Sequence, residues 1–160
     1  MSLDAFVRCT CIRDGKVKKP HPFPGRLTLD DHSGSPSLTG DPTEEEWEAH
    51  DQWVQDSCEH EGFLVSEFLG NITRAQHVRE FLRGLQGDPG PKFPLLLKKV
   101  VYDGTHTGDW IPVKQTPALL REVTTVLASS DILTQGEKEF FEAMKRLCDA
   151  SIETGNPITF

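Results

Sequence analysis

The chain has 160 residues, a net charge of −8 and 36% hydrophobic residues, which suits one globular domain with its own core. The acidic balance argues against nucleic acid or an anionic membrane surface as the main partner, because both attract basic proteins. No apolar window approaches the roughly 18 residues that a membrane span needs, and the N-terminal segment lacks the features of a secretory signal. We therefore expect a cytoplasmic protein with its four cysteines reduced.

The first predicted element is a strand over residues 3–12, LDAFVRCTCI. One face of this strand would carry small and apolar side chains at every second position: Leu3, Ala5, Val7, Cys9 and Cys11. A short strand is predicted at residues 26–30, and residues 31–42 read as an irregular segment because they are rich in Gly, Ser and Pro.

The first predicted helix follows this segment. Asp41 would be its N-cap, Pro42 its first residue and Glu44 the capping-box partner. The helix would run to Cys58 and bury one side, formed by Trp47, His50, Val54 and Cys58. Its first turn is acidic, which complements the helix dipole.

Three further helices are predicted from their first residues and their apolar spacing. The second begins near Thr73, and the third is capped by Thr116. The fourth pairs Thr134 with Glu137 as a capping box and ends near Gly155.

Two β-rich runs flank a Gly-containing turn in FPLLLKKVVYDGTHTGDWIPV, which predicts a hairpin over about residues 95–113. The segment FLVSEFLG, residues 63–70, fits the period of neither a helix nor a strand. Together these elements predict a single α+β domain. A small antiparallel sheet, made of the N-terminal strand and the hairpin, would be packed by three to four helices.

The densest group of reactive side chains lies in SCEHEG, residues 57–62. The candidate binding residues there are Cys58, Glu59, His60 and Glu61. The end of a helix is a poor place for a cysteine nucleophile, because the helix dipole raises the pKa of a thiol there. The sequence also lacks an H-E-x-x-H motif, a G-x-S-x-G motif and a phosphate-binding glycine loop. A non-enzymatic protein is therefore the favoured interpretation.

A metal site is the alternative for the same residues. Cys9 and Cys11 would point the same way on a strand and supply one edge of a tetrahedral site. Cys58 and His60 would supply the other two ligands if their segment is extended, and three cysteines with one histidine are a set that zinc favours. The spacing lacks a C-x-x-C pair, and buried free cysteines also pack as small hydrophobes. The alternative to a zinc site is therefore that these thiols pack in the interior and bind no cofactor.

Trp53 lies off the predicted buried side of the first helix. An exposed tryptophan beside an acidic helix turn would make an anchor for a protein partner. The leading hypothesis is a protein-binding module, for example an acidic immunity or inhibitor protein that covers a basic surface. The alternative is a metal-binding protein or metal-dependent enzyme centred on Cys58 and His60, with Cys9 and Cys11.

Four stretches also carry a family resemblance: MSLDAFVRCTC, CEHE, GNI ahead of a helix, and FPLLLKKV. With these the chain resembles small stand-alone bacterial proteins that begin Met-x-Leu-Asp and carry a Cys-Glu-His-Glu block, a family with no assigned activity. The resemblance implies a bacterial, single-domain, intracellular protein. It transfers no catalytic role to any residue of the block.

Overall fold

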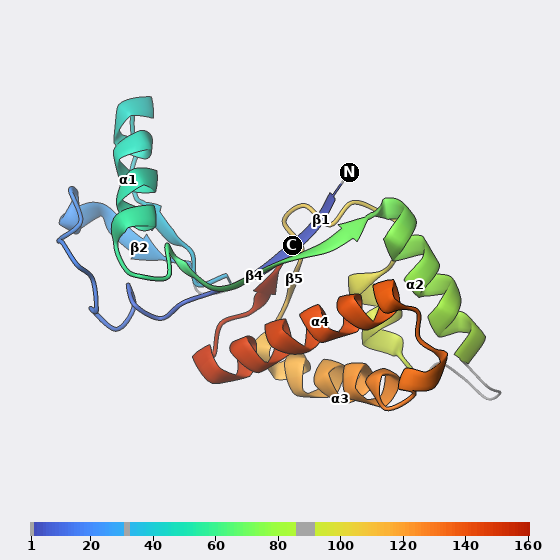
Figure 1. Cartoon of the computed structure of the whole chain (residues 1–160). Coiled ribbons are helices and arrows are strands. Elements are labelled where there is room, and N and C mark those ends of the chain that lie inside the picture. Colours follow the sequence, from blue (N-terminus) through green and yellow to red (C-terminus); the bar gives the residue numbers. More distant parts are fainter. Residues whose placement is uncertain (1, 31–32, 86–91) are drawn as a thin grey trace.

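The computed structural model describes residues 2–30, 33–85 and 92–160. As predicted, the fold is α+β (Figure 1). Four strands form an antiparallel sheet in the order β4-β1-β6-β5, and two more form a separate pair, β2-β3. The strands are β1 Ser2–Arg8, β2 Leu27–Leu29, β3 Pro36–Leu38, β4 Phe63–Asn71, β5 Trp110–Ile111 and β6 Ile158–Thr159. The main helices are α1 Glu44–Asp56, α2 Ile72–Leu85, α3 Thr116–Leu127 and α4 Gln135–Thr154. Short helical turns are η1 Pro24–Arg26, η2 Leu96–Val100, η3 Val113–Gln115 and η4 Ser130–Ile132.

The molecule has two parts, which we call the body and the lobe. In the body, α2, α3 and α4 lie on one side of the four-stranded sheet (Figure 1). The chain leaves the sheet at the end of β1 and returns to it at the start of β4. The lobe is the excursion between these points, residues 9–62, and contains β2, β3 and α1 (Figure 1).

The body has its own hydrophobic core. Leu3, Ala5 and Val7 are buried on one face of β1, as the alternation in the sequence predicts. They belong to one cluster with side chains of α4 at helical spacing: Phe140, Phe141, Met144, Leu147 and Cys148. Every buried member of this cluster lies outside residues 9–62, so the body does not depend on the lobe for its core.

The lobe, by contrast, buries very little apolar surface. Among its described residues the buried hydrophobic side chains are Leu38, Trp53 and Cys58, and the buried polar ones are His21, His50 and Ser57. A unit this small does not stabilise a fixed structure by burial alone, and such units generally carry a covalent or metal cross-link.

The helix starts follow local hydrogen bonds. In α4 the predicted capping box is confirmed, because Thr134 and Glu137 each accept a hydrogen bond from the other's backbone N–H. In α1 the predicted cap was wrong by two residues. Thr43 and Glu46 form the capping box there, with the same spacing as the predicted pair.

The N-terminal strand is shorter than predicted and ends at Arg8 rather than Ile12. The register of β1 against β4 shifts between Val7 and Arg8. The buried side chain of Asn156 then donates hydrogen bonds to the carbonyl oxygens of Arg8 and Cys9, at 2.8 and 3.3 Å. These carbonyls are therefore occupied by a side chain where the ladder would continue, and both Cys9 and Cys11 lie beyond the strand.

The predicted hairpin over residues 95–113 does not form. Its first half is the helical turn η2, and its second half contributes β5, which pairs with β6. The carboxylate of Glu122 in α3 accepts hydrogen bonds from the N–H groups of Leu95 and Leu96, at 2.9 to 3.1 Å. This carboxylate satisfies the N–H groups at the start of the turn, which favours the helical conformation. The segment that the sequence left undecided, residues 63–70, lies in β4.

Candidate metal centre

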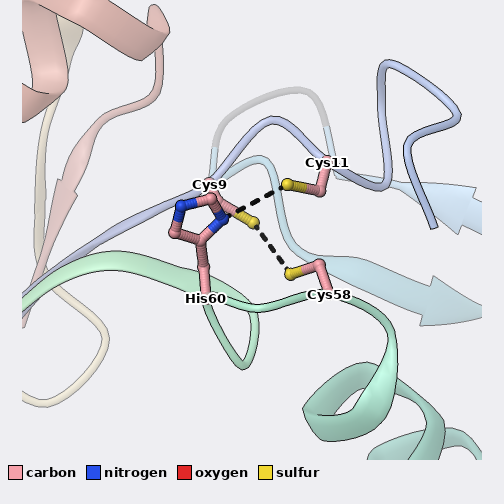
Figure 2. Close-up of side chains that lie close together, drawn as sticks. All are labelled: Cys9, Cys11, Cys58 and His60. Carbon is pink, nitrogen blue, oxygen red and sulfur yellow. Dashed lines mark hydrogen bonds between the residues drawn. The ribbon is translucent and has the colours of Figure 1, made fainter. Parts of the chain in front are cut away.

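Four side chains from two distant segments meet where the lobe joins the body. Cys9 and Cys11 follow β1 on the way into the lobe, and Cys58 and His60 lie between α1 and β4 on the way out. Figure 2 shows the three sulfur atoms and the imidazole ring of His60 turned toward one another. One donor atom from each of the four residues lies within 4.8 Å of all the others.

Individual distances within this cluster are short. The sulfur atoms of Cys9 and Cys58 are 3.6 Å apart, and Nδ1 of His60 is 3.4 Å from the sulfur of Cys11 (Figure 2). In the described part of the chain, this is the single group of three or more His, Cys, Asp and Glu side chains with donor atoms close enough to share a metal ion. The sequence alone left open whether Cys58 and His60 lie near Cys9 and Cys11. In the structure the two pairs of side chains are in contact.

A tight turn over residues 58–62 brings Cys58 and His60 to the same side. The N–H of Glu61 bonds to the carbonyl of Cys58, and the N–H of Phe63 bonds to the carbonyl of His60, at 3.4 and 2.9 Å. Glu61 has φ +52° and Gly62 has φ +87°. A left-handed glutamate is uncommon and costs conformational energy, so the surrounding turn has to impose it.

The backbone of this turn also acts on the Cys58 thiol. Burial opposes its ionisation, but backbone hydrogen bonds from Gly62 and His60, with help from Cys9, lower the pKa of Cys58 to about 7. Burial raises the pKa of Cys9 to about 12 and also raises the pKa of Cys11. Cys58 is therefore the thiol that ionises first, and a cation would be needed to draw the protons from the other two near neutral pH.

The two segments are joined by backbone contacts on both sides of the cluster. The N–H of Cys9 donates to the carbonyl of Gly62, at 3.2 Å, and the N–H of Lys18 donates to that of Ser57, at 2.8 Å. These backbone hydrogen bonds thus hold the two segments together around the four donor groups.

The other predicted site residues lie elsewhere. Glu59 and Glu61 are exposed and their carboxylates are not part of the cluster. The prediction that Trp53 is exposed was wrong, because it is 5% exposed. Its Nε1 donates to the carbonyl of Lys19 at 3.0 Å, and its ring packs against His21 at a centroid distance of 4.6 Å. It cannot serve as a surface anchor for a partner.

The buried side of α1 is in fact rotated by about one residue from the predicted one. His50 and Trp53 are buried, whereas Trp47 is 38% exposed. Cys58 is buried as predicted, although it lies two residues beyond the end of the helix. Cys148 lies in the body core, as its position on the apolar side of the last helix predicts.

Two residues that support the cluster were not singled out from the sequence. Gly62 carries the left-handed conformation of the turn, and a Cβ there would lie 3.2 Å from Cγ1 of Val54. A glycine at the end of the CEHEG block was the available signal for it. Asn156 binds the carbonyl of Cys9 from almost the other end of the chain, and no local pattern indicates that contact.

Fold and site together define an α+β protein with a cluster of three cysteines and one histidine between its two parts. Comparison of the chain with models of known families, with curated proteins and with solved structures gives no match. No helix within the described ranges combines the length and the apolar composition that crossing a membrane would require. A function therefore has to be inferred from the donor set and its geometry.

Proposed function

We propose that this protein binds one zinc ion through the sulfur atoms of Cys9, Cys11 and Cys58 and Nδ1 of His60. The ion would fix the lobe to the body. The observation that carries the proposal is that these four donors, from segments almost fifty positions apart, lie within 4.8 Å of one another.

The donor set supports zinc over other metals. Thiolates favour soft or borderline cations, and three thiolates with one imidazole form a common tetrahedral zinc shell. Ideal zinc bond lengths place two sulfurs about 3.8 Å apart and a sulfur and a nitrogen about 3.5 Å apart. The distances of 3.6 Å between Cys9 and Cys58 and 3.4 Å between Cys11 and His60 are close to these values.

The same donor set supports a structural role. Four protein ligands complete a tetrahedral shell and leave no position for a substrate or an activated water. The lobe needs a cross-link, because its described residues bury only a handful of apolar side chains. An ion bound to both connecting segments would close the lobe at its base, which lowers the entropy that the lobe loses on folding.

Metal content tests the proposal directly. Protein purified without an affinity tag should contain about one equivalent of zinc by elemental analysis, and its melting temperature should fall when a chelator is added. Cys58→Ser and His60→Ala should each lose most of the metal. Cys148→Ala is the matched control, because it removes a cysteine that lies in the body core, and it should keep its zinc.

Two results would contradict the proposal. One is less than about a tenth of an equivalent of metal together with a melting temperature that the chelator leaves unchanged. The other is equal metal content in Cys58→Ser and in wild-type protein, which would assign the ion to a different site.

A further inference from the structure

A cavity of about 240 Å³ lies beside the candidate metal centre, where the lobe meets the body. Arg8 and Asn156 line it from the body, and Arg13, Asp30 and Gly34 line it from the lobe. Two arginines therefore line one small space in a protein whose net charge is −8.

Arg8 is half-buried and is held in one orientation. Its Nε donates to Oγ of Ser35 at 2.9 Å, and its guanidinium carbon lies 5.7 Å from the ring centroid of Phe6 and 5.0 Å from that of Phe63. No carboxylate of the described chain lies within the 4.0 Å of an ion pair with Arg8. Cys9, when ionised, is an anionic group that acts on the Arg8 guanidinium, and an oxyanion in the cavity would add the charged oxygen partner that partly buried cations usually have.

Arg13 also lines the cavity, and its guanidinium group is held by residues at the end of α4 and just beyond it. It donates to the carbonyl of Thr154 at 2.9 Å and to Oδ1 of Asn156 at 3.3 Å, and its Nε lies 3.5 Å from the carboxylate of Asp14. The amide of Asn156 also binds the carbonyl of Arg8. The buried Asn156 therefore links the backbone of Arg8 to the guanidinium group of Arg13.

The remaining walls limit what fits. Ile12, Leu29 and Pro36 contribute apolar surface. Asp30 contributes a carboxylate, whose Oδ1 accepts hydrogen bonds from the N–H and the hydroxyl of Ser33 at 2.6 and 2.8 Å. A second anionic group would be repelled on that side, whereas a hydroxyl group would be accepted there.

We propose that this cavity binds a small organic anion. Its phosphate or carboxylate group would lie at Arg8 and Arg13, since forked guanidinium donors match both oxyanions. A short carbon skeleton would lie against the apolar wall, with a hydroxyl group toward Asp30. The proposal goes beyond the metal centre and does not require the ion.

The test uses the protein as purified and three probes: glycerol 3-phosphate, glycerate and glycerol. Each is titrated at constant ionic strength while the amide signals of Gly34 and Gly62, which line the cavity, are followed by nuclear magnetic resonance. Saturable shifts with a charged probe but not with glycerol support the proposal. Of glycerol 3-phosphate and glycerate, the one that binds with the higher affinity identifies the preferred oxyanion. No saturable shift at millimolar concentrations, or an equal response to glycerol, overturns it.

Substitutions locate the binding. Arg8→Gln should lower the affinity for the charged probe at least about tenfold, the usual loss for a charge-assisted hydrogen-bonded pair. Arg146→Gln is the matched control, because Arg146 pairs with Glu67 outside the cavity, and it should bind within about twofold of wild type. Should Arg8→Gln fail to fold, Arg13→Gln carries the same expectation. Unchanged affinity for the charged probe in a folded variant of either arginine overturns the proposal. Metal content is measured in every sample, so that weaker binding of the anion can be distinguished from an effect of losing the metal ion.

Discussion

Gly62 shows how a single residue without a functional group can shape a candidate metal centre. Its φ of +87° is accessible to few other residues, and a Cβ at this position would meet Cγ1 of Val54 at 3.2 Å. Its backbone contributes to the low pKa of Cys58 and accepts the hydrogen bond of Cys9. Gly62 therefore contributes to the turn, to the ionisation of the Cys58 thiol and to the contact between the two segments.

We predict that Gly62→Ala destabilises the protein by about 1–3 kcal/mol, the cost of a left-handed residue with a side chain. Gly84→Ala is the matched control. Gly84 lies in α2, and its added Cβ would meet nothing within 4 Å, so it should stabilise the protein by about 0.5–1 kcal/mol. Urea unfolding of both variants measures the two changes in the free energy of unfolding, which should have opposite signs. Equal effects of the two substitutions would show that the backbone at Gly62 is not constrained.

The four donor residues were identifiable from the sequence as residue types, but not from the reason first given. Cys9 and Cys11 were expected to share a strand face, yet both lie past the end of β1. The loop after the strand brings them to Cys58, and the side chain of Asn156, more than 140 positions away, binds the carbonyl of Cys9 in this loop. Contacts between residues so far apart in the sequence produce no periodic pattern from which they could be predicted.

At the scale of elements, the local capping signal held in α4, whereas in α1 the capping box begins two residues later than predicted. The capping box of α4 needs residues three positions apart, and it forms as predicted. The hairpin failed because the helical turn η2 is stabilised by Glu122, which is 26 and 27 positions from its partners. The spacing of the buried residues Phe93, Leu96 and Val100 does follow a helix, so this part of the error was avoidable.

The contact of α1 with β3 depends on a chain of hydrogen bonds through two buried histidines. The N–H of Phe23 donates to Nδ1 of His21 at 2.9 Å, which leaves Nε2 of His21 to donate to Nδ1 of His50, also at 2.9 Å. Nε2 of His50 then donates to the carbonyl of Pro36 at 3.4 Å. His21 accepts at Nδ1 and donates at Nε2 in this chain, which is the hydrogen-bonding pattern of a neutral imidazole.

The stability of the lobe should therefore depend on pH. Burial, with a smaller effect of His50, lowers the pKa of His21 below its ordinary value of 6.5. The unfolded chain then binds the proton more readily than the folded one. The stabilising contribution is complete above about pH 6.5 and is lost as the pH falls through this value toward the lower pKa of the folded state.

Urea unfolding at pH 7.5 and 5.5 measures this dependence, with a slope of at most about 1.4 kcal/mol per pH unit from His21. His21→Phe removes the titrating group, so its stability should fall less over the same interval. Both proteins keep the four donor residues, so any proton competition with a metal ion is common to both and cancels in the comparison. Parallel pH profiles for the two would rule out His21 as the source.

At the scale of the whole molecule, the arrangement assigns different kinds of stabilisation to the two parts. The body buries a continuous apolar cluster from its sheet and helices, so its stability comes from packing. The lobe buries few apolar side chains, and under the proposed function a metal ion held by Cys9, Cys11, Cys58 and His60 at its base would stabilise it. The overall α+β class was predictable from local patterns. The division into two parts was not, since it follows from where the buried residues fall in space.

This division leads to a prediction about where metal removal is felt. Under the proposed function, a chelator should speed amide hydrogen exchange in residues 9–30 and 33–62 by about a hundredfold or more, the linkage expected when the ion is present at 100 times its Kd. Exchange in α3 and α4 should stay unchanged, because their core contains no lobe residue. Cys58→Ser should show the fast lobe without chelator, and Cys148→Ala should respond as wild type does. Faster exchange throughout the chain would instead mean that the lobe and the body unfold as one unit, and unchanged exchange in the lobe would mean that the cluster carries no stabilising ion.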